Sequence, residues 1–360
     1  VCVRSGAGDA ADWSDEAYRE AGCTVVADQA DVFERSDLVV RVNGLGGTAA
    51  ADLDSYRSGQ TVVGLLGPYD LDDELEVLAD RGVTAFALEL MPRISRAQSM
   101  DALSSMSSIG GYKSTIVAAE RLPKLFPLQM TAAGTVQPAE VFVIGAGVAG
   151  LQAIATAERL GASVRAYDIR LEAREEVQSL GADFVELDLE TEGSGDDEGY
   201  AREMDEEFYR QQRKELTRVV GESDVVITTA AIPGKPAPEL VTEEMVAGME
   251  PGSVIVDLSA ATGGNCELTV PDETIDHDGV EIYGPTNLPA TVAHHASQLY
   301  SNNVYNFIQN MFDDERRLET DDEVVESTML THDGAVQWVH PAERDAEEPA
   351  DDETEAETDA

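Results

Sequence analysis

The sequence predicts an α/β protein with two Rossmann-like, doubly wound parallel-sheet domains joined by long helices, with a cleft between them. Strand and helix signals alternate along most of the 360 residues, and a glycine fingerprint lies between one strand and the helix after it. Short apolar runs that alternate with amphipathic segments are typical of parallel sheets covered by helices. The chain is also long enough for two domains of ordinary size.

The N-terminal domain is predicted to cover residues 1–130. We expect its strands at Thr24–Ala27, Leu38–Asn43, Thr61–Leu66 and Thr84–Leu90, and its helices at Ser14–Glu20 and Asp70–Asp80. A long helix follows at Met100–Glu120, and Pro123 and Pro127 end it. Because the chain opens at Val1 directly in a strand signal, we expect the first strand and helix of this domain to be missing.

The second predicted domain covers residues 131–289 and begins with a linker at Met130–Val136. Apolar runs predict its buried parallel strands at Val141–Ile144, Ala162–Tyr167, Phe184–Leu187, Val225–Thr229, Ser253–Leu258 and Glu281–Tyr283. An amphipathic segment at residues 291–312 predicts a helix that returns to the first domain, which residues 290–342 complete. The acidic tail at residues 343–360 lacks aromatic residues, and we expect it to be disordered.

The strongest functional signal is the glycine fingerprint between the strand Val141–Ile144 and the following helix. Gly145 permits a tight turn, Gly147 lets the backbone approach a pyrophosphate, and Gly150 lets helix and strand pack closely. The free N–H groups and the positive end of the helix dipole favour phosphate at this helix start. The fingerprint therefore predicts a dinucleotide site; the alternative is a glycine turn in a nucleotide-free Rossmann unit.

Asp168 stands at the end of the next predicted strand, 18 residues after Gly150. An acidic side chain in this register accepts a hydrogen bond from the ribose 2′-OH of a dinucleotide. The 2′-phosphate of NADP would meet a like charge at the same place. The sequence therefore favours NAD over NADP as the cofactor.

A second cluster of polar residues lies just upstream of the linker. Arg93 is suited to hold a phosphate or a ribose, while Gln98 and Asp101 are suited to hydrogen-bond a nicotinamide amide or ribose hydroxyls. Ser104 lies further along the start of the same helix. The alternative interpretation is an exposed, capped helix start with a local Arg–Asp pair. The spacing alone leaves both interpretations open.

The segment Asp188–Tyr200 is polar, contains glycine and is too long for an ordinary strand–helix connection. Loops of this kind are usually lids or disordered segments. We expect a lid over the nucleotide, which would exclude water when it closes.

The charge of the chain is strongly acidic throughout. There are 71 acidic and 24 basic side chains, giving a formal net charge of −47. Such a charge repels itself unless concentrated salt screens it, so we expect a cytoplasmic protein of a salt-accumulating halophile. The alternative is an acidic face for a basic partner. Because the chain has no basic stripe, we do not expect nucleic-acid binding.

Neither metal sites nor membrane spans are predicted. The three cysteines are scattered without CxxC spacing, and the five histidines lack a second ligand at metal-binding spacing. No apolar run approaches the roughly 18 residues that a membrane-spanning helix needs.

Longer motifs carry a family resemblance. Along the chain stand the runs PRISRAQSMDALSS, GYKSTIVAAE, MTAAGTV, GAGVAGLQAIATAERLGA, TTAAIPGKPAPELVTEEMV and GSVIVDLSAATGGNC. In these runs and their order, residues 1 to 340 resemble the NAD(H)-binding component, domain I, of the proton-translocating NAD(P) transhydrogenases.

The resemblance implies a set of residues that bind NAD(H). Before the Rossmann domain these are Arg93, Ile94, Ser95, Gln98, Ser99, Met100, Asp101 and Ser104. Beside the glycine turn they are Val148, Asp168, Ile169, Arg170, Gly199, Tyr200 and Ala231. Tyr200 corresponds to the tyrosine of the family's mobile loop. Gln98, Asp101 and Arg93 are the residues we expect to take part in catalysis, the first two by orienting the dihydronicotinamide.

The resemblance also implies a reaction and partners. Hydride would pass directly between NADH on this chain and NADP⁺ on an NADP(H)-binding subunit, while a separate membrane subunit translocates protons. No side chain would exchange a proton with the substrate, so the protein would orient the nucleotides and exclude water. A homodimer is implied, and the helix at residues 291–312 is expected to contribute contacts. The chain would lie at the cytoplasmic face of the cell membrane.

Two other functions stay open at this point. Alanine dehydrogenase resembles this chain in fold and motif order, but it needs a histidine as general acid/base before its Rossmann domain and an aspartate where Ala261 stands. The first histidine here is His277. The third possibility is a non-catalytic subunit that senses NAD(H). Arg41 and Asn43 also depart from both families, which often carry lysine in that stretch.

Overall fold

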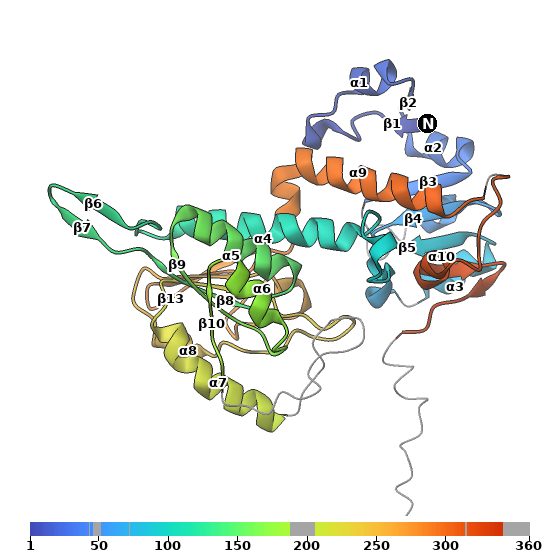
Figure 1. Cartoon of the computed structure of the whole chain (residues 1–360). Coiled ribbons are helices and arrows are strands. Elements are labelled where there is room, and N and C mark those ends of the chain that lie inside the picture. The colour runs from blue at the N-terminus through green and yellow to red at the C-terminus, as the bar shows by residue number, and fades with distance from the viewer. Residues whose placement is uncertain (43, 46–51, 72, 188–205, 314, 341–360) are drawn as a thin grey trace, which may run out of the picture.

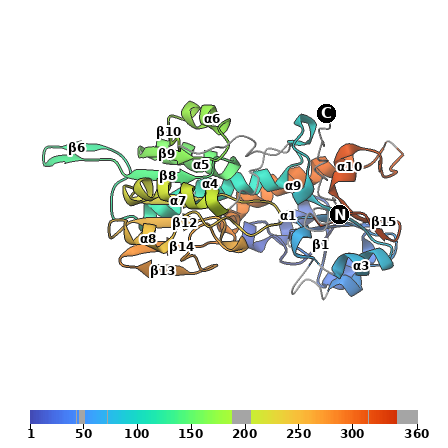
Figure 2. The same ribbon diagram turned by 90° about the horizontal axis from the view of Figure 1, so that it is seen from below.

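The computed structural model describes residues 1–42, 44–45, 52–71, 73–187, 206–313 and 315–340. Two lobes lie on either side of the middle of Figure 1, and the long helix α4 (Ala102–Arg121) runs from one toward the other. The first third of the chain and the C-terminal elements build one lobe, and the Rossmann sheet builds the other (Figures 1 and 2). The α/β architecture predicted from the alternating pattern is confirmed.

The N-terminal lobe contains a five-stranded sheet in the order β16-β15-β5-β4-β3. Its parallel strands are β3 (Leu38–Arg41), β4 (Thr61–Gly64) and β5 (Thr84–Ala87). β15 (Met329–His332) pairs antiparallel with β5, and β16 (Ala335–Val336) pairs with β15. The far end of the chain therefore completes the sheet of the first lobe.

Local patterns placed some elements of this lobe incorrectly. The apolar run at Thr84–Leu90 is a strand only to Ala87, after which Leu88–Leu90 turn as a 3₁₀ helix. β1 (Cys2–Arg4) and β2 (Thr24–Val26) form a separate parallel pair beside the main sheet. The helices are α1 (Asp15–Glu20), α2 (Gln29–Arg35), α3 (Glu74–Asp80) and α10 (Glu323–Thr328). We did not predict α2 or α10, which are short and depend on packing against the lobe.

The Rossmann lobe contains a seven-stranded sheet in the order β10-β9-β8-β11-β12-β14-β13. Its strands are β8 (Glu140–Ile144), β9 (Ser163–Tyr167), β10 (Asp183–Phe184), β11 (Val225–Thr228), β12 (Val254–Asp257), β13 (Thr274–His277) and β14 (Val280–Tyr283). All neighbours are parallel except β13, which pairs antiparallel with β14. The chain order reverses between β8 and β11, which in open α/β sheets is where ligands bind.

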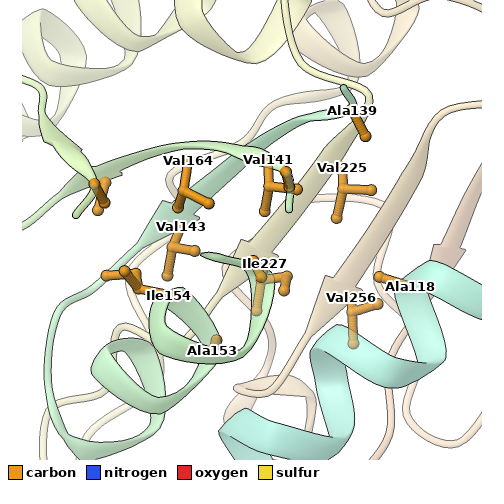
Figure 3. Packing of buried hydrophobic residues seen from close by; sticks show 14 of the residues in the cluster. Ala118, Ala139, Val141, Val143, Ala153, Ile154, Val164, Val225, Ile227 and Val256 are labelled. Carbon is orange, nitrogen blue, oxygen red and sulfur yellow. The ribbon is translucent and has the colours of Figure 1, made fainter. Parts of the chain in front are cut away.

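Helices cover both faces of this sheet, because its strands are apolar on both sides. They are α5 (Val148–Leu160), α6 (Ala173–Ser179), α7 (Glu206–Gly221) and α8 (Glu243–Ala247). Val141 and Val143 point to the face that α5 covers, where Ala153 and Ile154 meet them (Figure 3). Phe142 and Ile144 point to the other face and pack with residues of α7 and α8.

α4 links the lobes through close backbone contact. Ala118 of α4 belongs to the buried cluster of the Rossmann sheet and lies near Val256 (Figure 3). A Cβ atom on Gly111 would lie only 2.0 Å from the carbonyl oxygen of Ala149 in α5. Glycine is therefore needed at position 111 for α4 and α5 to pack at this distance.

α9 (Ala293–Asn310) returns to the first lobe, as the amphipathic pattern predicted. Phe307 of α9 is fully buried, and its ring meets Phe86 of β5 edge-on with 5.7 Å between the ring centroids. Val304 is buried in the same cluster. Most of the apolar face of α9 is thereby used within this chain.

The expected linker at Met130–Val136 is in fact a hairpin of β6 (Gln129–Thr131) and β7 (Gly134–Val136). It projects well beyond the Rossmann lobe in both views (Figures 1 and 2). All six of its strand residues are exposed, and Met130 has 75% of its surface accessible. Within the described ranges, no helix is long and apolar enough to cross a membrane.

Candidate functional site

A cavity of about 390 Å³ lies at the carboxyl ends of the Rossmann strands and is lined by both lobes. The first lobe and α4 contribute Tyr69, Glu89, Arg93, Leu103, Ser104 and Ser107. The Rossmann lobe contributes the glycine turn, the end of β9, part of α7 and the loop after β11. The cavity thus occupies the place where the strand order reverses.

The three glycines of the fingerprint have different surroundings. Gly145 has φ 94°, a left-handed conformation that side chains other than glycine rarely adopt. A Cβ atom on Gly150 would lie 1.8 Å from the carbonyl oxygen of Gly145, so helix and turn require glycine to pack. A Cβ atom on Gly147 would meet nothing within 4 Å, so this position faces open space. The geometry is the tight turn that the sequence predicted.

α5 begins at Gly147, which has no side chain to cap the helix. The N–H groups of the first helical turn therefore lack the side-chain cap that serine, threonine or aspartate would provide. Val148 stands in this turn and is 39% exposed, and Gly147 and Val148 both line the cavity. This helix start offers backbone donors to an anion.

Asp168 follows β9 and is only 6% exposed. Its Oδ2 accepts hydrogen bonds from the N–H of Ala146 (2.7 Å) and from Nη2 of Arg170 (3.0 Å). Its Oδ1 accepts from the N–H and the Nε of Arg170, both at 2.9 Å. The hydrogen bond to Asp168 raises the pKa of the Arg170 guanidinium. Asp168 therefore joins the glycine turn to Arg170, and both Asp168 and Arg170 line the cavity together with Ile169.

The start of α4 is fixed by Asp101, which caps the helix. Asp101 Oδ1 accepts from the N–H of Ser104 (2.8 Å), and Oδ2 accepts from the hydroxyl of Ser104 (2.5 Å). Ser104 lines the cavity, whereas Asp101 does not. The capping interpretation of Asp101 thus describes its contacts here.

The other residues predicted before the Rossmann domain surround this helix start. Arg93 is exposed and lines the cavity. Ser95 and Gln98 are exposed in the turn between Arg93 and Ser104, outside the cavity lining. Ile94 and Met100 pack into the core of the first lobe. The carbonyl of Ser99 accepts hydrogen bonds from Asn303 and Asn306 of α9, both at 3.1 Å.

The structure thus gathers nine of the predicted residues around one cavity: Arg93, Ser104, Gly145, Gly147, Val148, Asp168, Ile169, Arg170 and Ala231. Gly150 supports the turn from behind. The predicted lid segment, with Gly199 and Tyr200, lies outside the described residues, as do Asn43 and the tail from residue 341.

Sequence reasoning missed a buried polar pair in the cavity. Nε2 of Gln212 in α7 donates to the hydroxyl of Tyr167 at 2.9 Å, and the two residues are 2% and 4% exposed. Burial raises the pKa of Tyr167 to about 12, so its hydroxyl is neutral at physiological pH. Within the described part of the chain, Gln212 Oε1 is buried without a hydrogen-bond partner. A buried acceptor of this kind is costly unless a ligand or water satisfies it.

A second group that the sequence did not reveal is Glu89 in the first lobe. Its carboxylate accepts from the backbone N–H groups of Leu66 (3.1 Å) and Gly67 (2.7 Å). Burial raises the pKa of Glu89. Gly67 precedes the short 3₁₀ helix that carries Tyr69, and both Glu89 and Tyr69 line the cavity. Glu89 therefore holds the turn that forms this wall.

Family models match nearly the whole described chain. The model of the alanine dehydrogenase/PNT N-terminal domain matches residues 1–110, and that of the C-terminal domain matches residues 114–339.

Individual relatives place the chain more closely. The first of the two chains of the NAD(P) transhydrogenase alpha subunit of Rhodospirillum rubrum is 45% identical over 349 residues, which cover 95% of this chain and 90% of the relative. A crystal structure of transhydrogenase from Sinorhizobium meliloti has a TM-score of 0.82 at 42% identity and covers 93% of this chain and 90% of that chain.

Alanine dehydrogenase is a more distant relative. A structure of L-alanine dehydrogenase has a TM-score of 0.75 at 26% identity and covers 96% of this chain and 90% of that chain. The fold is common to both activities, while the sequence is nearer to the transhydrogenases. The chain belongs to the alanine dehydrogenase/PNT family and, within it, to the NAD(P) transhydrogenase alpha subunits.

Proposed function

We propose that this cavity binds NAD(H) and that the chain holds NADH while hydride passes directly to NADP⁺ on a partner subunit. The observation that carries the proposal is the meeting of three features in one cavity: the glycine turn, the uncapped start of α5 and Asp168. Each suits a different part of a dinucleotide.

The pyrophosphate would lie against Gly147 and the first turn of α5. Open space over Gly147 lets a ligand approach the backbone, and the helix start supplies N–H donors and a positive dipole end. Arg93 lines the same cavity from the first lobe and supplies a positive charge for a phosphate or a ribose. The anionic centre of the dinucleotide would therefore be held from both lobes.

The ribose nearest to Asp168 would compete with Arg170. The carboxylate already accepts four hydrogen bonds, one from Ala146 and three from Arg170. A carboxylate has about four lone-pair sites, so a ribose hydroxyl would replace or share an Arg170 contact. Gln212 Oε1 offers a further acceptor for an N–H or O–H group of the nucleotide.

The residues around the cavity suit hydride transfer without acid–base catalysis. No histidine occurs among the described residues that line it, and Thr262 rather than Ala261 reaches the cavity from that turn. NADH supplies the hydride, and this movement leaves no proton for a side chain to accept. The chain's own contribution would be to orient the nucleotide and to exclude water.

We further propose partners that match this role. NADP(H) would be held by a second subunit, and a separate membrane subunit would couple hydride transfer to proton movement. The chain would then act at the cytoplasmic face of the cell membrane. The domain limits 1–130 with 290–342, 131–289 and 343–360 remain our working description of this component.

The proposed function can be tested with the purified chain in molar KCl. NADH should bind in a fluorescence titration, and hydride should reach an NADP⁺ analogue only when a purified NADP(H)-binding transhydrogenase component is added. Alanine with NAD⁺, or pyruvate and ammonia with NADH, should give no turnover. Turnover of these amino-acid substrates would favour the alanine dehydrogenase alternative. NADH binding without transfer to the partner would favour the sensor alternative.

Gln98 provides a test of positioning. It lies in the turn between Arg93 and Ser104, which both line the cavity, and we propose that it and Asp101 orient the dihydronicotinamide. Gln98→Asn shortens the side chain, and because misplacement by about 1 Å is costly we expect hydride transfer to slow by roughly tenfold or more. NADH affinity should change little. Gln178→Asn, an exposed change on α6, is the control; equal rates in both variants would contradict the role.

A homodimer is also proposed, with a different contact surface from the one the sequence suggested. The buried face of α9 packs within its own lobe, with Val304 and Phe307 in the core. The hairpin β6–β7 instead exposes Met130 and Val136 far from the rest of the chain. We expect light scattering in molar salt to show twice the chain mass, and Met130→Asp to reduce it; a monomeric unaltered chain would contradict the proposal.

A further inference from the structure

The wall of the cavity that follows β11 has no regular secondary structure of its own. Residues 229–240, here called the β11 loop, contain neither helix nor strand. This loop contributes Thr229, Ala230, Ala231, Ile232, Pro233, Gly234, Pro238 and Leu240 to the cavity lining. Something outside the loop must therefore fix its backbone.

Asn265 fixes the loop at both ends. Its Nδ2 donates to the carbonyl oxygens of Ala230 (2.9 Å) and Pro238 (2.8 Å), and its Oδ1 accepts from the N–H of Ala230 (3.0 Å). Its own carbonyl accepts from the N–H of Leu240 at 2.8 Å. Asn265 is fully buried. Its amide is thus satisfied entirely by the backbone of the cavity wall.

A second side chain strengthens the same contact. The hydroxyl of Ser259 donates to the carbonyl of Ala230 at 2.8 Å. Ser259 and Asn265 begin and end one turn after β12, so both reach the β11 loop from the neighbouring strand. The position of Ala230 therefore depends on the conformation of that turn.

Asp257, the last residue of β12, organises the turn. Its carboxylate is fully buried and accepts hydrogen bonds from five donors. They are the N–H groups of Ser259, Asn265 and Cys266 and the hydroxyls of Thr228 and Thr269. Gly264 has φ 89°, and a Cβ atom there would lie 2.8 Å from Asp257 Oδ2. The turn can therefore wrap the carboxylate only with glycine at this position.

We propose that Asn265 is a positioning residue for NAD(H), held in place by Asp257 and acting through the β11 loop. The inference rests on the proposed function, because it takes NAD(H) as the ligand of the cavity. Asn265 does not itself line the cavity. It sets the wall that does, so its removal should loosen nucleotide binding before it unfolds the lobe.

Three variants separate this role from a general contribution to stability. Asn265→Ala removes all side-chain contacts to Ala230 and Pro238, and Ser259→Ala removes one. Ser223→Ala is the control, because Ser223 is 3% exposed and donates to the carbonyl of Val219 at 2.7 Å, at the opposite end of β11. NADH titration by fluorescence would be done in molar KCl, well below each melting temperature.

We expect Asn265→Ala to weaken NADH affinity by about tenfold, and Ser259→Ala by less, since each lost hydrogen bond changes a binding constant by about two- to tenfold. Ser223→Ala should keep the affinity of the unaltered chain even where its melting temperature falls equally. If Asn265→Ala does not fold, Ser259→Ala still tests the wall. Unchanged affinity in both variants, or an equal loss in Ser223→Ala, would overturn the inference alone. Absence of NADH binding by the unaltered chain would overturn the proposed function as well.

Discussion

Replacing Asp168 by serine is expected to turn an NADH site into one that also takes NADPH. The carboxylate would repel a 2′-phosphate and now occupies Arg170 through three hydrogen bonds. Serine removes the repulsion and releases the guanidinium, which can bind phosphate. Hydrogen bonds to charged groups contribute about 1.5–3 kcal/mol, so NADPH affinity should rise by roughly 10- to 100-fold. NADH affinity should fall, and both are measured by fluorescence titration.

Arg170 makes this result specific. In Asp168→Ser/Arg170→Ala the NADPH gain should disappear, because no cation then replaces the lost repulsion. Asp224→Ser is the matched control, since Asp224 also accepts a backbone N–H, that of Glu140 at 2.9 Å, and pairs with Lys124. Asp224 lies outside the cavity lining, so this change should leave the preference for NADH intact. A gain of NADPH affinity in the double variant would show that Arg170 has no part in it.

Low salt is expected to unfold the protein. The formal charge of −47 arises from 71 acidic and 24 basic side chains, so basic partners are too few for most carboxylates. Lowering the salt from about 1 M to about 0.1 M lengthens the screening distance from ~3 Å to ~10 Å, which lets neighbouring carboxylates repel one another. The melting temperature should fall steeply over this range, and far-ultraviolet circular dichroism should recover when KCl is restored.

A neutral osmolyte distinguishes screening from a general effect on burial. Sucrose favours the compact state by exclusion from the protein surface but does not screen charge. Sucrose at the osmolality of molar KCl should therefore restore much less of the melting temperature than KCl does. A melting temperature that is the same at both salt concentrations would refute the expectation of a halophilic protein.

The Rossmann unit around the glycine turn could be predicted from local sequence. Strand, turn, helix, second strand and Asp168 follow one another within about thirty residues, so local spacing encodes their relation. The positive φ of Gly145 and the close packing at Gly150 are what these glycines were expected to permit. The return of α9 to the first lobe followed from its apolar face, and the family from its motifs.

Short or irregular elements escaped the same reasoning. The hairpin β6–β7 has exposed strands without an apolar face, so its sequence resembles a linker. The strand predicted to Leu90 ends at Ala87, because the following residues turn and bring Glu89 to the N–H groups of Leu66 and Gly67. Apolar pattern alone does not distinguish a buried strand from a buried turn.

Contacts between distant segments emerged only from the folded chain. Gln212 lies beside Tyr167 because α7 packs on the sheet next to β9, and Asn265 holds Ala230 because β12 is the neighbour of β11. β15 completes a sheet that begins in the first quarter of the chain. Local propensity fixes where a strand forms, but the order of strands in a sheet depends on the burial of both faces at once. The walls of the cavity follow from that order, whereas its glycine turn follows from the sequence.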